Sequence, residues 1–174
     1  MALTRIGGAN AISGTIPQGN IANASLGAVT ALPAGVGGKA NQTVYVSQGS
    51  TQAVATTSFT DLTGVTLNIT PISTDSKILI TCELNNLFGT GEGSGIQIVR
   101  TIGGTSTNVY TGSQTYTNYF GGITDVESRY STTYLDSPST TSQVTYKIQV
   151  RTDNGNSVTF NRGDKTNLIA TEII

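Results

Sequence analysis

Residues 144–151 read VTYKIQVR, and this stretch decides the fold. Its apolar side chains alternate one for one with polar ones, which is typical of an antiparallel strand with one buried and one solvated face. The same period of two recurs at 65–69, 78–84 and 158–160, and no stretch has convincing helical periodicity. The sequence therefore predicts an all-β protein, an antiparallel β-sandwich or jelly-roll knob.

Turn signals separate these expected strands. Asp153-Asn154-Gly155-Asn156 lies between two alternating runs, so we expect a hairpin that joins 144–151 to 158–160. Glycine-rich stretches at 89–95, 103–104 and 121–122 punctuate the middle of the chain. The closing run, 168–174, is apolar enough to be a central strand or an interface strand.

Composition excludes several classes of function. The chain has 174 residues, 30 of them Thr, with one Cys, no His and no Trp. Without His, a Ser-His-Asp triad, a Cys-His dyad and a His-rich zinc site are excluded, and one Cys cannot form an intrachain disulfide. A formal net charge of -1 argues against nucleic acid as a partner. The longest uninterrupted apolar runs have three residues, so we expect no membrane insertion.

The first 42 residues differ from the rest. They are rich in Gly, carry only Arg5 and Lys39 as charges, and space single apolar residues irregularly. Such residues cannot build a core of their own, but another surface can bury them, so we expect an extended, partner-bound arm over 1–42 and a separate strand-rich domain over 43–174. A flexible linker is the alternative. The anchoring candidates are Ile6, Ile12, Ile16, Ile21 and Leu26.

Each candidate for chemistry has a simpler structural interpretation. Cys82 occupies one of the alternating positions that carry apolar side chains in 78–84, so we expect it to be buried and unreactive. Asp125 and Glu127, two residues apart, lack the facing geometry of a glycosidase pair. The oxygen ligands of 153–156 suit a tight turn better than calcium, and Arg162-Gly163-Asp164 is expected to be a polar turn rather than an integrin-type motif. We therefore expect no catalytic residue, no metal and no cofactor.

Aromatic residues gather in one segment, interleaved with Thr, Ser, Asn and Gly. Rigid rings among small polar residues make a good recognition surface, which also suits sugars, so one interpretation is that this segment binds a ligand. The alternative is that the rings pack a subunit interface, where Tyr is also enriched. The receptor-contact candidates are Tyr110, Tyr116, Tyr119, Phe120, Tyr130 and Tyr134.

Three stretches carry a resemblance to a known family. TGVTLNITPISTDSKILITCEL at 63–84, LDSPSTTSQVTYKIQV at 135–150 and the closing TEII at 171–174 resemble the C-terminal domains of bacteriophage fibre proteins, especially those of marine and cyanobacterial phages. The N-terminal stretch MALTRIGGANAISGTIPQGNIANASLGAVTALPAG also looks like the start of such proteins.

The resemblance implies a homotrimeric β-sandwich knob with an N-terminal arm that anchors it to the virion. Because only about 42 residues precede the knob, we expect a short tail fibre, which docks to a tail adaptor, nozzle or baseplate protein and contacts a host surface glycan. A capsid decoration or head-fibre protein, whose arm would bind the capsid protein, is the alternative. A glycan-degrading spike is disfavoured because the chain has few acidic residues.

Overall fold

The computed structural model describes residues 40–88, 92–112, 117–122 and 125–173. These residues form strands joined by turns and contain no helix. The strands are β1 (Ala40–Gln48), β2 (Gln52–Val54), β3 (Thr60–Ile69), β4 (Lys77–Phe88), β5 (Glu92–Ile102), β6 (Thr105–Thr111), β7 (Asn118–Phe120), β8 (Val126–Asp136), β9 (Val144–Thr152), β10 (Val158–Phe160) and β11 (Thr166–Ile173).

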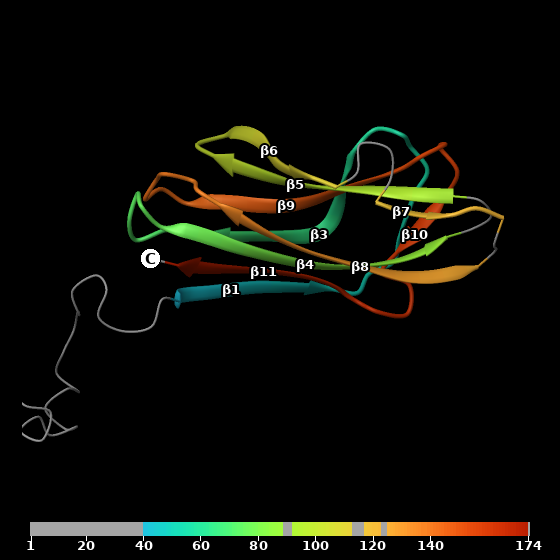
Figure 1. Ribbon diagram of the computed structural model, residues 1–174, viewed down its shortest axis with the longest axis horizontal. Helices are drawn as coiled ribbons and strands as arrows, with labels where there is room; N and C mark the ends of the chain where they lie inside the picture. The colour runs from blue at the N-terminus through green and yellow to red at the C-terminus, as the bar shows by residue number, and fades with distance from the viewer. Residues whose placement is uncertain (1–39, 89–91, 113–116, 123–124, 174) are drawn as a thin grey trace, which may run out of the picture. The chain divides into compact units, whose positions relative to one another are not determined.

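The strands form two antiparallel sheets that pack as a sandwich (Figure 1). The longer strands of the first sheet, sheet A, run in the order β1-β11-β4-β8, and short β10 and β2 extend it beside β4. The second sheet, sheet B, has the order β3-β9-β5-β6, and β7 also pairs with β5. These two strand orders, with the chain crossing repeatedly between sheets, define a jelly roll and confirm the predicted fold class.

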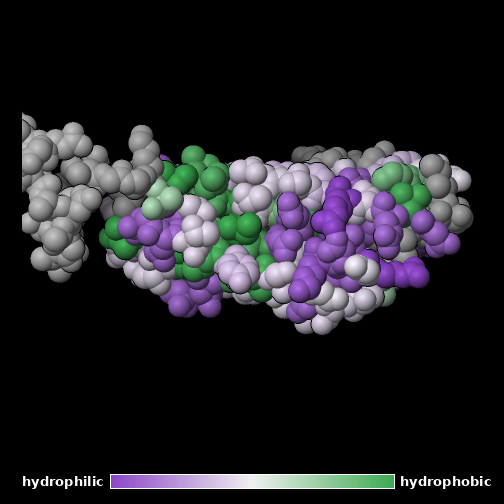
Figure 2. All heavy atoms as spheres, turned by 90° about the horizontal axis from the view of Figure 1, so that it is seen from below, coloured by the Kyte–Doolittle hydropathy of each residue, from purple (hydrophilic) through white to green (hydrophobic). Residues whose placement is uncertain are grey.

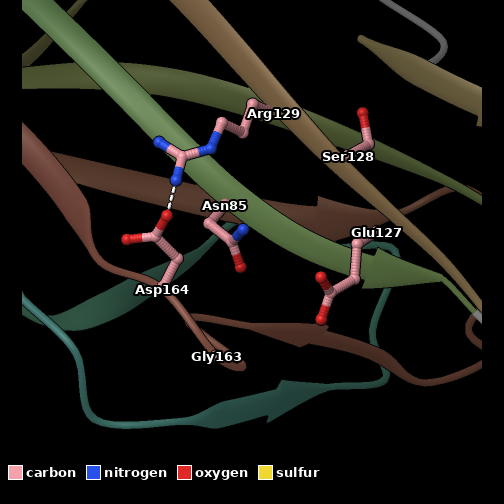
Figure 3. Close-up of a pocket in the computed structure, with 6 residues that line it drawn as sticks. All are labelled: Asn85, Glu127, Ser128, Arg129, Gly163 and Asp164. Carbon is pink, nitrogen blue, oxygen red and sulfur yellow. Dashed lines mark ion pairs between the residues drawn. The ribbon is translucent and has the colours of Figure 1, made fainter.

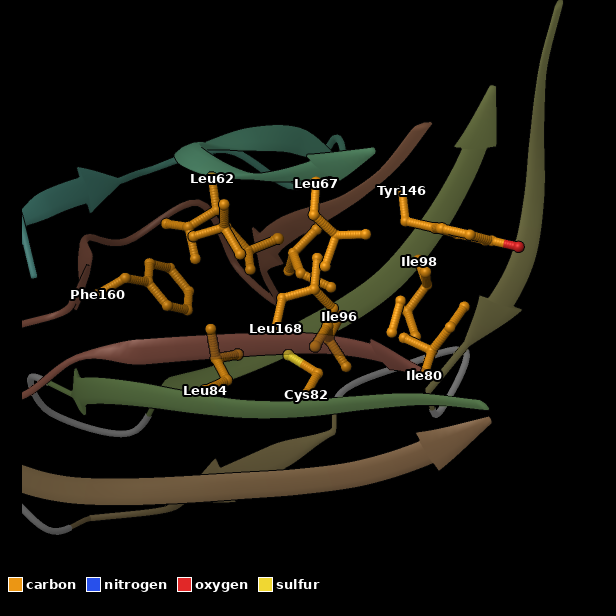
Figure 4. Packing of buried hydrophobic residues seen from close by; sticks show 14 of the residues in the cluster. Leu62, Leu67, Ile80, Cys82, Leu84, Ile96, Ile98, Tyr146, Phe160 and Leu168 are labelled. Carbon is orange, nitrogen blue, oxygen red and sulfur yellow. The ribbon is translucent and has the colours of Figure 1, made fainter. Parts of the chain in front are cut away.

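The core lies between the sheets and follows the alternation seen in the sequence (Figure 4). In β9 the side chains of Val144, Tyr146, Ile148 and Val150 are fully buried, while the residues between them are half-buried. Leu168 and Ala170 of β11 face them from the other sheet, and β11 is a central strand between β1 and β4, as expected. Burial of each such aliphatic side chain contributes about 1.5–3 kcal/mol to folding.

The predicted hairpin across 153–156 is wrong. The turn itself is present, because Gly155 has a φ of 83° and the Asn156 amide donates to Asn154 Oδ1 at 2.9 Å. However, β9 pairs with β3 and β5 in sheet B, whereas β10 pairs with β2 and β4 in sheet A. The turn therefore crosses from one sheet to the other, and both strands direct their apolar side chains into the same core.

A buried carboxylate fixes the start of β1. Glu172 of β11 is fully buried and accepts hydrogen bonds from Asn41 Nδ2 at 3.0 Å, Gln42 Nε2 at 2.6 Å and the Ile72 amide at 2.7 Å. These bonds place residues 40–42 in the sandwich, although the sequence interpretation assigned them to the arm. The remainder of the predicted arm lies outside the described residues.

Candidate functional site

Three of the predicted receptor-contact tyrosines close one open side of the sandwich. Tyr110 lies on β6, at the edge of sheet B, and Tyr130 and Tyr134 lie on β8, at the edge of sheet A. The hydroxyls of Tyr110 and Tyr130 are 2.8 Å apart, and the rings of Tyr110 and Tyr134 are tilted by 48° with centroids 5.8 Å apart. All three are half-buried and pack against the core, so this tyrosine cluster joins the two sheets.

Tyr130 of this cluster stays uncharged at ordinary pH. Burial, followed by the hydrogen bond to Tyr110, raises the pKa of Tyr130 to about 12. Its hydroxyl therefore acts as a neutral donor and acceptor, which suits a bond across the edge of a sandwich.

The other three aromatic candidates have different positions. Tyr119 on β7 is the most exposed, with 47% of its surface accessible. Phe120 beside it is half-buried and packs against the core. Tyr116 lies outside the described residues, as do Ile6, Ile12, Ile16, Ile21 and Leu26 of the predicted arm.

The outer face of sheet A is divided into two halves of different chemistry (Figure 2). In the half that begins at Ala40, the pairing register sets Tyr45 beside Ile169 and, in the neighbouring row, Leu79 beside Leu135. Tyr45 is 76% and Leu135 52% exposed, whereas Leu79 and Ile169 are half-buried. We call these four residues the apolar half-face. In an isolated chain they leave an apolar patch in contact with water.

The other half of this face is polar and contains a pocket of about 250 Å³ (Figure 3). Asn85 of β4, Glu127, Ser128 and Arg129 of β8, and Gly163 and Asp164 of the β10–β11 loop line this polar pocket. Arg129 forms an ion pair with Asp164 across it. The Asp of the Arg162-Gly163-Asp164 tripeptide is therefore engaged within the protein, which agrees with the structural interpretation of that motif.

The pocket exists because two strands share one side of β4. β11 pairs with β4 as far as Glu83, and β10 takes over at Asn86. The loop between them rises over the outer face. Asn161, which has a φ of 60°, holds this loop in place. Its backbone amide donates to the Asn85 carbonyl at 3.1 Å, and its Oδ1 accepts a hydrogen bond from Thr166 Oγ1 at 2.5 Å.

The remaining candidates for chemistry have structural roles. Cys82 is fully buried, and burial together with the negative charge of Glu83 raises the pKa of its thiol to about 12. Asp153 Oδ1 accepts a hydrogen bond from the Gly93 amide at 3.0 Å, so this carboxylate fixes a turn. Only Glu127 of the Asp125–Glu127 pair lines the pocket. Within the described residues, no group of three or more His, Cys, Asp or Glu side chains could hold a metal ion.

Sequence reasoning missed the pocket residues Asn85 and Arg129. Asn85 follows the apolar stripe 78–84 and belongs to no motif, and the sequence around Asp164 indicates only a turn. The sequence shows only that Asn85 and Arg129 occupy outward positions of strands and that Asp164 lies in a turn. This pattern is too common among polar residues to predict a site. The described residues contain no helix, and therefore none that is long and apolar enough to cross a membrane.

Comparison with solved structures identifies viral capsid-like folds. The crystal structure of the infectious bursal disease virus VP2 subviral particle is similar with a TM-score of 0.50 and 16% identity, over 76% of this chain and 32% of that chain. The structure of the Gx strain of the same virus has a TM-score of 0.44, 15% identity and coverage of 76% and 37%. This chain thus spans about a third of the length of those proteins, and the likeness concerns the jelly-roll fold. No protein-family model and no curated protein sequence matches the chain.

Proposed function

We propose that this protein is a structural component of a virion, a short phage tail fibre without enzymatic activity. In this proposal three copies assemble through the apolar half-face, the arm before residue 40 attaches the trimer to the tail, and the knob contacts a glycan on the host surface. The observation that carries the proposal is the division of the outer face of sheet A. It provides an apolar surface beside Ala40, at the start of β1, and a polar surface at the other end.

The apolar half-face supports association between copies. Large apolar side chains such as Tyr45 and Leu135 are costly to leave in water, and subunit interfaces are enriched in Tyr and depleted in charge. Copies attached to one site by their arms would bring their Ala40 ends together. The apolar half-face lies at that end, so it would be near the axis of the assembly.

A capsid location is the second candidate. The jelly roll is shared with a region of a viral capsid protein, so the same knob and arm would also suit a decoration or head-fibre protein on the shell. Imaging of virions labelled with an antibody against the knob distinguishes the two. Label at the tail is expected, label over the head would favour the alternative, and particles without label would reject the virion proposal.

Adsorption tests the proposed contact with the host. The purified full-length protein, labelled with a fluorophore, should bind to host cells and reduce adsorption of the phage. A protein that neither binds cells nor competes with the phage would reject host attachment while leaving the virion location to the imaging result.

A further inference from the structure

We propose that the polar pocket on sheet A binds a single uncharged sugar ring, the terminal residue of a host-surface glycan. The inference rests on the proposed host-attachment function and assigns that function to a specific site. The site differs from the tyrosine-rich segment that sequence analysis favoured, because three tyrosines of that segment are engaged in joining the sheets.

The pocket is built by three segments that are distant in sequence. Asn85 forms part of its base, Glu127 and Arg129 extend from β8, and Asp164 lies in the β10–β11 loop (Figure 3). Its volume of about 250 Å³ is below the range of roughly 300–1,000 Å³ that is usual for drug-sized ligands. A pocket of this size suits one sugar ring rather than an oligosaccharide.

Asn85 provides an independent indication of a ligand. The residue is only 5% exposed, and its Oδ1 has no hydrogen-bond partner in the protein. Figure 3 shows its side chain between Asp164 and Glu127. A buried amide oxygen without a partner is unfavourable, so a rotation of the Asn85 side chain that lets a ligand hydroxyl donate to Oδ1 would relieve an existing cost.

The charges of the pocket select the chemical class of the ligand. The carboxylates of Glu127 and Asp164 disfavour an anion, and the Arg129 guanidinium next to Asp164 disfavours a bare metal cation. The pocket offers hydrogen-bond acceptors on both carboxylates and donors on the guanidinium and amide groups. Because each sugar hydroxyl both donates and accepts, a neutral sugar can satisfy this mixed set.

Gly163 keeps the pocket open. Its φ is 76°, and a Cβ at this position would lie 3.6 Å from Glu127 Oε1. A side chain here would therefore be strained and would occupy space between the loop and β8. Glycine also lets the loop backbone approach a bound ring closely.

The location of the pocket fits the proposed function. Asn85 pairs with Arg129 near one end of β4, whereas Ile173, the partner of Ala40, pairs with Lys77 at the other end. The pocket is thus at the end of sheet A away from Ala40. It stays accessible when copies associate through the apolar half-face.

Saturation-transfer NMR on the full-length protein tests the inference directly. The probes are glucose, galactose, mannose, rhamnose and N-acetylglucosamine, together with surface polysaccharide extracted from cells to which the protein adsorbs. We expect at least one probe to bind. Glu127→Ala should weaken that binding by about tenfold or more, because it removes a charged hydrogen-bond acceptor.

Glu83→Ala is the matched control. Glu83 is also an exposed glutamate on the outer face of sheet A, but its carboxylate accepts from Asn167 Nδ2 at 3.2 Å outside the pocket. Its substitution should leave sugar binding unchanged. Asp164→Asn, which removes the second carboxylate and retains the side-chain shape, should weaken binding as Glu127→Ala does.

The outcomes separate this inference from the proposed function. Failure of all sugars and of the polysaccharide to bind, or binding that Glu127→Ala and Asp164→Asn leave unchanged, would overturn the pocket assignment. If cell adsorption persists in that case, host attachment stands and uses another surface. If the wild-type protein does not adsorb to cells at all, host attachment itself is wrong.

Discussion

Asp136 connects the two sheets through a buried ion pair. Its carboxylate accepts from Arg100 Nη1 at 2.9 and 3.1 Å and from the Tyr146 hydroxyl at 2.5 Å. Asp136 belongs to β8 of sheet A, whereas Arg100 and Tyr146 belong to sheet B. Burial, with the hydrogen bond to Asp136, raises the pKa of Tyr146 far above its usual range, so the phenol remains a neutral donor to the carboxylate.

Removal of this carboxylate should be costly. Asp136→Ala leaves the Arg100 guanidinium and the Tyr146 hydroxyl without their partner, and we expect the free energy of unfolding to fall by about 3 kcal/mol. Urea denaturation measures the change. The exposed pair of Asp61 and Lys147, 2.9 Å apart, is the comparison, and Asp61→Ala should cost less than about 1 kcal/mol. Equal losses in the two variants would contradict the role given to Asp136.

Glu172 should make stability depend on acid pH. Burial by itself would raise the pKa of this carboxyl, but the hydrogen bonds that the carboxylate accepts, among them those from Gln42, Asn41 and the Ile72 amide, outweigh burial and lower the pKa below 4.5. The unfolded state therefore binds the proton more tightly, so this contribution to stability is complete above about pH 4.5 and is lost as pH falls through the lowered value.

Thermal melts between pH 7 and 3 test this sign. The melting temperature of the wild-type protein should fall with pH below about 4.5, and Glu172→Gln should have a smaller pH dependence together with lower stability at pH 7. A pH profile of Glu172→Gln parallel to that of the wild type would show that another group is responsible.

We expect Tyr130 to have a structural role and Tyr119 to have a role in recognition. Tyr130→Phe removes a hydrogen bond of the tyrosine cluster and should lower the free energy of unfolding by about 1 kcal/mol, with little effect on cell adsorption. Tyr119→Ala, at an exposed position, should change stability less than Tyr130→Phe does and should reduce adsorption. Paired denaturation and adsorption assays measure both effects, and the reverse pattern would contradict this division.

At the scale of the elements, Gly64 allows β3 to bulge. The register between β3 and β9 shifts between Asp61 and Thr66, and Gly64 within this interval has a φ of 78°. A residue with a side chain would be strained in this left-handed backbone conformation, and its Cβ would displace the side-chain amide of Gln48. Glycine is therefore required both by the backbone conformation and by the close approach of Gln48.

The bulge predicts a difference between two glycines. Gly64→Ala should lower the free energy of unfolding by about 1–2 kcal/mol, from backbone strain and the movement of Gln48. Gly49→Ala, whose Cβ would meet only the flexible side chain of Lys165, should change it by less than about 0.5 kcal/mol. Chemical denaturation of both variants is the measurement, and a neutral Gly64→Ala would mean that the bulge relaxes without cost.

Strand identity could be predicted from the sequence, but strand pairing could not. The alternation in β9 and in residues 78–84 records burial on one face, which is a local property. The turn at 153–156 has the composition of a hairpin, yet β10 pairs with β2 and β4 because Val158 and Phe160 complete the core of the opposite sheet. Local turn chemistry does not specify which sheet receives the next strand.

The candidate site was harder to predict for the same reason. The polar pocket joins Asn85, Glu127 and Asp164, which lie on three different segments and meet only through the jelly-roll topology. The tyrosines, by contrast, are close together in the sequence, so the segment can be recognised without the fold. The topology nevertheless divides them between a half-buried cluster at the edge and exposed Tyr119.

At the scale of the whole molecule, the chain is polar but only 11% of its residues are charged. The proposed roles of the two halves of the outer face of sheet A account for this composition. In the proposed assembly, copies of the chain cover the apolar half-face and the polar end binds a neutral glycan, so few Lys and Glu residues are needed. Such a surface also has little electrostatic attraction for salt to screen. Assembly is therefore the central claim of the proposed function.

Mass in solution tests that claim most directly. Light scattering of the full-length protein should give three times the 18.0 kDa of one chain. Tyr45→Asp should shift the mass toward the monomer, whereas Ser47→Asp, two residues further along the same outward face, should retain the trimer. A folded wild-type protein with the mass of a single chain would contradict the trimer and the role of the apolar half-face.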